Sequence, residues 1–451
     1  MDVLMAFRFK LPHDFYFWGQ DRGGSLVPLI AHILFMIFHL SPLWSVSLTH
    51  YFILIAGYFS LSSFLKKNFT KIILAAFLFL PGYGFIDLLW YFIGTQLCLV
   101  GVLLFLFKKT EESTGKTYAV NGYLFSAVII SLLAIWVSDI SAASVLLAVL
   151  FFLFRNRRNK NVLKITTAYF LPALVLIPAT IVLMKSTAMA RAENYSSINS
   201  PEIAWKGIGI VLDTISGILS FSTYNVFVTA SVYATILLGI FFLFVRLRRM
   251  VQFSETKYDW VYFFILNAVM IFAMVLFSRW AYLNDLGRRY FISVYADIVM
   301  ITLLFAERIQ NFKMERVAFI LILFIALCGP VSTIYHYKYI DPRKLESSTS
   351  EAMKFDQLGP CGLIGDYWSA YLCGMSRPDL VISTPHEGNW DRNPELSREA
   401  VNQPAVYLMS YDWLDSFPDS VIQFRKLLLK DGEEFLIGNR HICKYRPEKI
   451  N

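Results

Sequence analysis

Long apolar runs separated by short charged loops fill the chain up to about residue 337. A membrane-spanning helix needs roughly 20 mostly apolar residues, and most runs approach that length. Pro81-Gly82 interrupts the second run and the fifth is short; such helices are tolerated where protein or a cavity surrounds them. We predict about ten spans, at residues 43–65, 71–87, 88–107, 119–137, 140–154, 163–184, 222–245, 260–278, 289–306 and 317–337.

Composition supports a membrane protein. Hydrophobic residues make up 56% of the 451 residues and charged residues only 16%, whereas soluble proteins carry about 25% charged residues. The core of a single water-soluble domain could not bury this much apolar surface. The net charge of +8 comes mainly from short loops between apolar runs, so membrane topology explains it without a nucleic-acid partner. We therefore predict an all-α transmembrane domain over residues 43–337.

Lysines and arginines are divided unequally between the two sets of loops. The positive-inside rule places the richer set in the cytoplasm, which leaves the segment from about residue 338 on the outer side. The richer loops lie around residues 66–71, 108–116, 155–164, 246–257 and 308–316.

The side of the membrane on which the N-terminal 42 residues lie depends on whether the number of spans is even or odd. Ten spans place both chain ends on the same side, so residues 1–42 are also expected outside. We expect 26–42, with its two histidines and two prolines, to be an interfacial helix, and a first membrane helix to be missing upstream of Met1. The alternative is that 26–42 is itself a span.

The segment 338–451 changes to a mixed polar composition and predicts a small α/β domain. Short apolar runs at 380–383, 405–409 and 434–445 suggest strands, Gly438-Asn439 a hairpin turn, and 419–430 a helix. An oxidising compartment would permit one disulfide among its three cysteines, with Cys361–Cys373 the closest pair in sequence. The long external loop 185–221 contains amphipathic stretches that suit the membrane surface.

An acidic and aromatic stretch covers residues 13–24 and contains Asp14, Asp21 and Arg22. A carboxylate here would serve as general base toward an acceptor hydroxyl or amine, and the aromatic rings suit sugar stacking. The alternative interpretation is an aromatic membrane belt whose acids simply stay in water.

A second stretch places arginines in an external loop, where the positive-inside rule disfavours them: Arg279, Arg288 and Arg289, the last followed by Tyr290. Guanidinium groups bind phosphate through two parallel hydrogen bonds, as a polyprenyl-phosphate headgroup would require. The alternative is binding of ordinary anionic lipid or pairing with Asp285.

Three further acids stand near or within the spans. Asp87 and Asp139 lie at the external ends of spans, where they line a cavity or mark the interface. Asp297 lies inside a span and is a functional candidate for that reason; the alternative is pairing with an arginine of another helix.

With these features the chain resembles the GT-C superfamily of membrane glycosyltransferases, especially the bacterial branch similar to protein mannosyltransferases and the aminoarabinose transferase. Residues 19–24 followed by 26–29 look like a variant of that branch's acidic-loop-to-Pro-Leu passage. Residues 288–290 resemble its Arg-Tyr entry to a late helix, and 361–368 are similar to appended periplasmic domains.

The resemblance implies transfer of a sugar from a polyprenyl-phosphate donor to a glycan, lipid or protein acceptor, on the outer face of a bacterial inner membrane. Asp21, and then Asp14, would activate the acceptor. Cationic groups would stabilise the leaving phosphate. No cofactor is required; a divalent cation is compatible but no metal site is predicted. The implied phosphate-binding residues are Arg288, Arg289, Tyr290 and Arg279, and the implied cavity residues are Arg22, Asp87 and Asp139.

Two other functions fit the pattern. A transporter or flippase of a lipid-linked envelope intermediate would also be polytopic, although such proteins often show internal repeats and none is visible here. A non-catalytic assembly protein for envelope polysaccharide is the third alternative.

Overall fold

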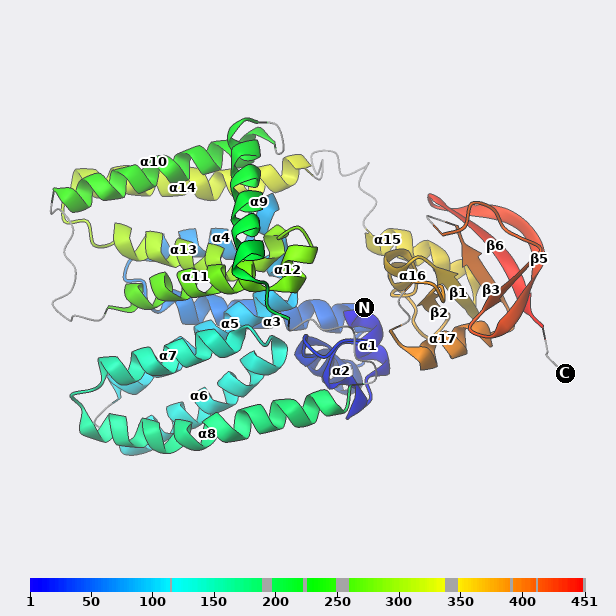
Figure 1. The fold of residues 1–451 in the computed structure, drawn as a ribbon, viewed down its shortest axis with the longest axis horizontal. Helices are drawn as coiled ribbons and strands as arrows, with labels where there is room; N and C mark the ends of the chain where they lie inside the picture. The colour runs from blue at the N-terminus through cyan, green and yellow to red at the C-terminus, as the bar shows by residue number, and fades with distance from the viewer. Residues whose placement is uncertain are drawn as a thin grey trace. The chain divides into compact units, whose positions relative to one another are not determined.

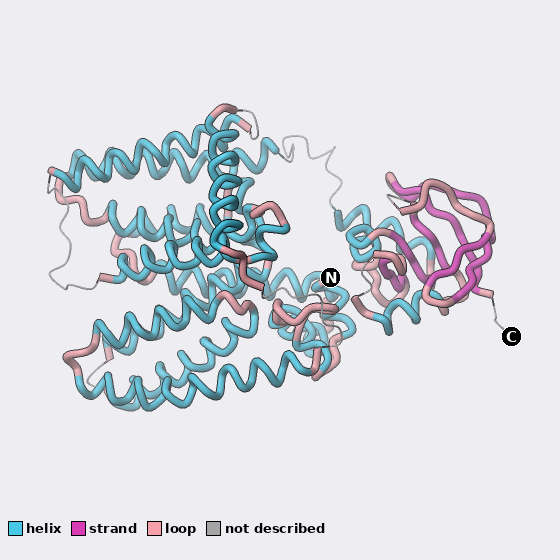
Figure 2. The backbone as a smooth tube through the Cα atoms, viewed as in Figure 1, coloured by secondary structure: helices cyan, strands magenta, loops and turns pink. Residues whose placement is uncertain are grey.

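The computed structural model describes residues 1–113, 116–188, 197–221, 225–248, 259–336, 348–389, 392–410 and 413–448 (Figure 1). The chain divides into two compact units. The helical unit comprises His50–Leu183 and Glu193–Ile340. The mixed unit combines Met1–Thr49, Met184–Ala192 and Asp341–Asn451. Figure 2 shows that the strands gather in the mixed unit, at the C-terminal end of the chain.

Helices long and apolar enough to cross a membrane dominate the helical unit, and the described residues contain eight of them. This confirms a polytopic membrane protein. The eight are α3 (Pro42–Ser62), α5 (Phe92–Glu112), α6 (Thr117–Val137), α8 (Lys160–Ser186), α10 (Val226–Leu247), α11 (Trp260–Phe277), α13 (Ile292–Ala306) extended by η3 (Arg288–Phe291), and α14 (Phe312–His336).

The other two predicted spans have unusual forms. The run 71–87 becomes α4 (Asn68–Phe79) and η2 (Tyr83–Leu89), which meet at an angle of 89°. The run 140–154 becomes α7 (Ser141–Arg155), which has only 15 residues. Both deviations occur where the sequence shows an interruption or a short run.

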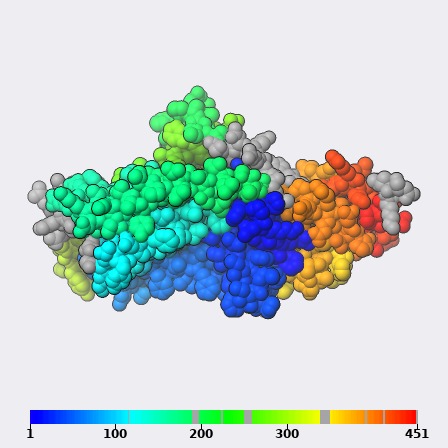
Figure 3. All heavy atoms as spheres, turned by 90° about the horizontal axis from the view of Figure 1, so that it is seen from below, coloured from blue at the N-terminus to red at the C-terminus, as the bar shows by residue number. Residues whose placement is uncertain are grey.

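Outward-facing apolar side chains show what surrounds these helices. Along α8, Leu174 and Val175 are 62% and 70% exposed, and Val182 is 67% exposed. This helix forms a continuous band on the face of the helical unit seen in Figure 3. Because such a surface is unfavourable in water, lipid is its natural solvent.

The break between α4 and η2 is stabilised by α14. Pro81 has no N–H to donate, and the groups freed around it find partners on α14. The Thr333 hydroxyl donates to the Pro81 carbonyl oxygen at 3.0 Å, and the Tyr83 N–H donates to Ser332 Oγ at 3.1 Å. A Cβ on Gly82 would lie 3.3 Å from the Gly329 backbone, so glycine permits this close approach. Hydroxyls of a neighbouring helix thus satisfy the unwound backbone.

Ion pairs join the helix ends that carry the basic loops. Arg155 donates to Glu111 at 2.8 Å, and its guanidinium also lies 5.0 Å from the Trp260 ring centroid. Glu307 accepts from the backbone N–H groups of Lys66 and Lys67 at 3.0 and 2.9 Å. The loops with the most lysine and arginine therefore meet at one end of the helical unit.

The mixed unit contains a six-stranded sheet of order β2-β1-β3-β6-β5-β4, in which β1, β2 and β3 are parallel and the rest antiparallel. This confirms a small domain with strands and helices. Its strands are β1 (Cys361–Gly365), β2 (Val381–Pro385), β3 (Val406–Met409), β4 (Ser420–Gln423), β5 (Lys426–Ile437) and β6 (Arg440–Pro447). Its helices are α15 (Ser348–Met353), η5 (Lys354–Leu358), α16 (Tyr367–Cys373) and α17 (Pro394–Val401).

Two expectations for this domain are wrong. The predicted helix 419–430 is instead the β4–β5 hairpin, whose turn residues Phe424 and Arg425 both have positive φ (49° and 62°). Cys361 and Cys373 are not joined; both are free thiols buried in the core around β1, and burial raises the pKa of each to about 12.

Two N-terminal helices belong to the mixed unit. The first, α1 (Asp2–Arg8), buries Val3 to Ala6. The second, α2 (Leu26–Phe38), has 13 residues and leaves Met36, Ile37 and Phe38 about 60% exposed. A helix of this length reaches only about 20 Å, which is too short to span a bilayer by itself; its position at the membrane interface stays a prediction.

Within the helical unit, α9 (Pro201–Leu219) crosses α10, α11 and α13 steeply (Figure 1). Its inner side packs on Leu286 through Gly207, where a Cβ would lie 3.1 Å from Leu286 Cδ1. Its outer surface is divided: Trp205 and Leu212 are 73% and 59% exposed on one side, while charged residues occupy the other. That division is typical of a helix lying in the membrane interface.

We predict that α9 lies flat at the lipid headgroups. A spin label at Leu212→Cys should be relaxed mainly by oxygen, which concentrates in lipid, and one at the neighbouring Asp213→Cys mainly by a water-soluble nickel complex. Both positions are exposed, so they form a matched pair for power-saturation measurements in proteoliposomes. Equal access of the nickel complex to both labels would contradict the prediction.

Candidate functional site

The arginines singled out by the sequence lie beside η2, and local backbone structure places them there. Before η3 the chain turns through Asp285 and Leu286, which both have positive φ (53° and 49°). Such a conformation is strained for leucine. Burial of Leu286 among residues such as Leu276 and Ala281 holds the turn in place, and Arg288 follows after Gly287.

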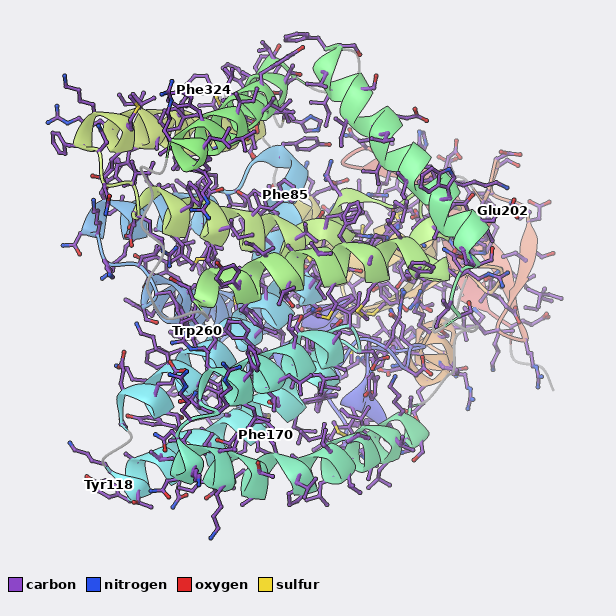
Figure 4. All side chains as sticks on the ribbon, turned by 60° about the vertical axis from the view of Figure 1, so that its left-hand side comes forward. Phe85, Tyr118, Phe170, Glu202, Trp260 and Phe324 are labelled. Atoms are coloured by element: carbon purple, nitrogen blue, oxygen red, sulfur yellow. The ribbon has the colours of Figure 1, made fainter. Side chains whose placement is uncertain are left out.

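The other half of the site is η2, which carries Asp87. Its backbone is fixed by α14 at the helix break described above. Phe85, labelled in Figure 4, stacks on Tyr295 of α13 with ring centroids 4.0 Å apart. Contacts with α14 and with α13 therefore hold η2, and with it Asp87, in a defined position.

Arg288 pairs loosely with Asp87. Its Nε lies 3.9 Å from Asp87 Oδ2, and the two side chains are 34% and 13% exposed. The guanidinium also lies 4.2 Å from the ring centroid of Tyr83, within range of a cation–π interaction. Arg288 thus lies between the Asp87 carboxylate and the face of an aromatic ring.

Arg289 makes its hydrogen bonds and ring contacts with neutral groups. Its Nη2 donates to Tyr290 Oη at 3.3 Å, and its guanidinium lies 5.6 Å from the Tyr91 ring centroid. It also approaches Asn284 Oδ1 at 3.5 Å. Among the residues that the structure describes, no carboxylate lies within ion-pair distance of Arg289. The cluster of Asp87, Arg288 and Arg289 thus brings two guanidinium groups and one carboxylate together beside aromatic rings.

Two predicted site residues lie outside this cluster. Arg279 is exposed at the start of α12 (Arg279–Leu283), and in the described part of the chain its side chain has no hydrogen bond or ion pair with the cluster. Asp139 is exposed in the turn between α6 and α7. Tyr290, by contrast, joins the cluster as predicted, through Arg289.

The two predicted catalytic acids belong to the mixed unit and have different environments. Asp14 is 3% exposed and accepts from the Lys10 N–H at 2.7 Å and from Trp18 Nε1 at 3.0 Å. Burial raises the pKa of its carboxyl, against the opposing effect of these hydrogen bonds. Asp21 is half-exposed. A buried carboxylate that accepts two hydrogen bonds suits a structural role. Of the two acids, Asp21 is therefore the one accessible to an acceptor.

Arg22 is also half-exposed, and its Nε donates to Gln20 Oε1 at 3.3 Å. It therefore accompanies Asp21 on the same loop of the mixed unit.

The sequence did not single out the neutral partners Tyr83, Tyr91 and Asn284, because tyrosines are common at membrane interfaces. The Pro81-Gly82 break just before Tyr83 was the available signal. The buried Asp297 accepts from Asn267 Nδ2 at 2.7 Å, not from an arginine. No set of histidine, cysteine and carboxylate groups suited to a metal ion occurs among the described residues.

In comparisons with protein-family models, curated protein sequences and solved structures, nothing matches this chain. Its fold and helices define it as a multi-pass membrane protein with a small C-terminal sheet domain. The function of its site therefore has to be argued from the chemistry of the site itself.

We predict that Asp87 competes with bound anions for Arg288. Asp87→Asn removes a negative charge about 4 Å from the guanidinium, which should tighten binding of an anionic headgroup by roughly tenfold. Binding of a short-chain prenyl phosphate to the purified protein in detergent would measure this. Asp139→Asn removes an exposed carboxylate elsewhere in the unit and is the matched control. Weaker binding by Asp87→Asn would contradict the prediction.

Proposed function

We propose that the protein is a glycosyltransferase that resembles the GT-C superfamily and transfers a sugar from a polyprenyl-phosphate donor on the extracytoplasmic face. The observation that carries the proposal is the cluster of two adjacent guanidinium groups, Arg288 and Arg289, beside Asp87 and aromatic rings. It stands at the start of α13, whereas the basic loops meet at the end of that helix. A helix of this length separates the two by about 22 Å.

The chemistry of the leaving group supports this proposal. A polyprenyl-phosphate donor releases a lipid phosphate, and fixed cations stabilise the charge as it develops. Two adjacent guanidinium groups supply several directed N–H donors. The rings of Tyr83 and Tyr91 give apolar surface beside them, as the junction of headgroup and acyl chain requires.

The proposed topology follows from the distribution of charge. The helix ends with the basic loops face the cytoplasm, and α7 and the bent α4–η2 pair count as crossings, which gives ten in all. The C-terminal domain is then periplasmic, in a bacterial inner membrane. The acceptor is a glycan, lipid or protein. Asp21 activates it, and Asp14 holds the loop that carries Asp21.

A transporter or flippase of a lipid-linked intermediate is the second candidate, and one observation favours it. The bent α4–η2 pair and Pro330 within α14 resemble the discontinuous helices of transporters. Proteoliposomes separate the two functions: a transferase forms a new glycosidic bond without moving the lipid phosphate, whereas a flippase moves a labelled lipid phosphate between leaflets without forming one.

We predict that the protein binds polyprenyl phosphate through Arg288 and Arg289. Native mass spectrometry should show a lipid adduct on the wild type that Arg288→Ala/Arg289→Ala loses by at least about tenfold, since each charge-assisted bond contributes roughly 1.5–3 kcal/mol. The control Lys313→Ala/Arg316→Ala removes two cations from the basic end and should retain the adduct. Equal binding by both double variants would refute the assignment of the site.

We predict further that Asp21→Asn lowers sugar transfer by about 10²-fold or more, as expected for loss of a general base, while expression and donor binding stay unchanged. A radiolabelled-donor assay in membranes would measure this. Asp285→Asn, an exposed acid before η3, is the control for loss of a carboxylate. Full activity of Asp21→Asn would eliminate the proposed catalytic role.

A further inference from the structure

Both ends of the chain build the mixed unit. Leu4 and Met5 of α1 are 2% and 0% exposed, and they share a core with Trp18 and with residues more than 350 positions away. The distant members are Tyr371, Ile382, Leu396 and Ala400, from α16, β2 and α17. Because β2 is an outer strand of the sheet, this N-terminal segment covers a flank that would otherwise expose apolar side chains.

Charge complementarity reinforces this contact. Glu395 and Glu399 stand one turn apart on α17, and two basic residues of the N-terminal segment meet them. Arg8 binds both carboxylate oxygens of Glu399, one of them at 2.9 Å from Nη2. Lys10 Nζ lies 3.3 Å from Glu395. A bidentate arginine–carboxylate pair fixes orientation as well as contact.

A glycine brings the loop after Trp18 close to the domain. Gly19 has φ of +68°, and a Cβ there would lie 3.0 Å from Arg392 Cγ. Both its conformation and its lack of a side chain are therefore needed.

Asp14 connects this contact to the loop that carries Asp21. Its carboxylate accepts from Trp18 Nε1, and its backbone carbonyl accepts from Ser25 Oγ, the N-cap residue of α2. Tyr16 and Gly24 form an antiparallel bridge that closes the loop between them. Trp18 anchors one side of this closed loop in the core of the domain, and Asp21 lies on the other.

We infer that residues 1–24 are a structural part of the C-terminal domain, and that this domain positions Asp21. Both chain ends then lie on the same side of the membrane, and the helices between them cross it an even number of times. Only the positioning of Asp21 rests on the proposed function; the two-ended domain stands on the packing and ion pairs alone.

Thiol cross-linking tests the domain in the full-length protein in membranes. A short bis-maleimide that spans the length of the removed arginine and glutamate side chains should join Arg8→Cys to Glu399→Cys, because these positions lie too far apart for a direct disulfide, so that N- and C-terminal tryptic fragments stay joined on a gel. The native cysteines are all buried. The control Arg8→Cys/Glu433→Cys uses β5, which lies four strands from β2, or about 19 Å. Absence of the Arg8–Glu399 cross-link, or equal trapping of the control, overturns the inference.

A charge swap tests positioning. Arg8→Glu and Glu399→Arg should each accelerate chymotryptic release of the N-terminal fragment and lower sugar transfer by roughly tenfold or more, and the double swap should restore both. Binding of polyprenyl phosphate should stay unchanged throughout. Faster release with full transfer would overturn the positioning of Asp21 only. Cross-linking without any transfer by the wild type would instead refute the proposed function.

Discussion

Inside a bilayer a backbone amide or carbonyl has no water to bind, and each unpaired group costs several kcal/mol. The candidate site depends on how this protein meets that constraint at the break between α4 and η2. Ser332 and Thr333 of α14 bind the freed groups around Pro81 and Tyr83. These two hydroxyls hold η2 in place, and η2 in turn presents Asp87 to Arg288.

The same constraint made much of the fold predictable. Spanning helices must be apolar over their whole length, so the sequence shows their positions directly. The Pro81-Gly82 interruption and the short run at 140–154 correspond to the bent pair and to α7. Water-facing segments carry no such requirement. The stretch 419–430 hides its hairpin from sequence reasoning because the turn uses Phe424 and Arg425, whereas asparagine and glycine are usual at such turns.

The site was only partly predictable for a related reason. The sequence singled out Asp87, Arg288 and Arg289 individually, because charges at an external membrane boundary are unusual. It could not show that Asp87 faces Arg288, since the contact depends on the packing of η2 against η3 and α13. The sequence likewise could not show that Asp14, a candidate catalytic acid, is buried, because its partner Trp18 is covered by residues from the far end of the chain.

The two-ended domain has a consequence for biosynthesis. A ribosome makes Leu4, Met5 and Trp18 before the membrane helices, and the residues that bury them, such as Ile382 and Leu396, after those helices. The apolar side chains of the N-terminal segment therefore stay uncovered while the intervening helices are inserted into the membrane. The nascent chain then needs a chaperone or the lipid surface to cover these side chains until the C-terminal domain has been made.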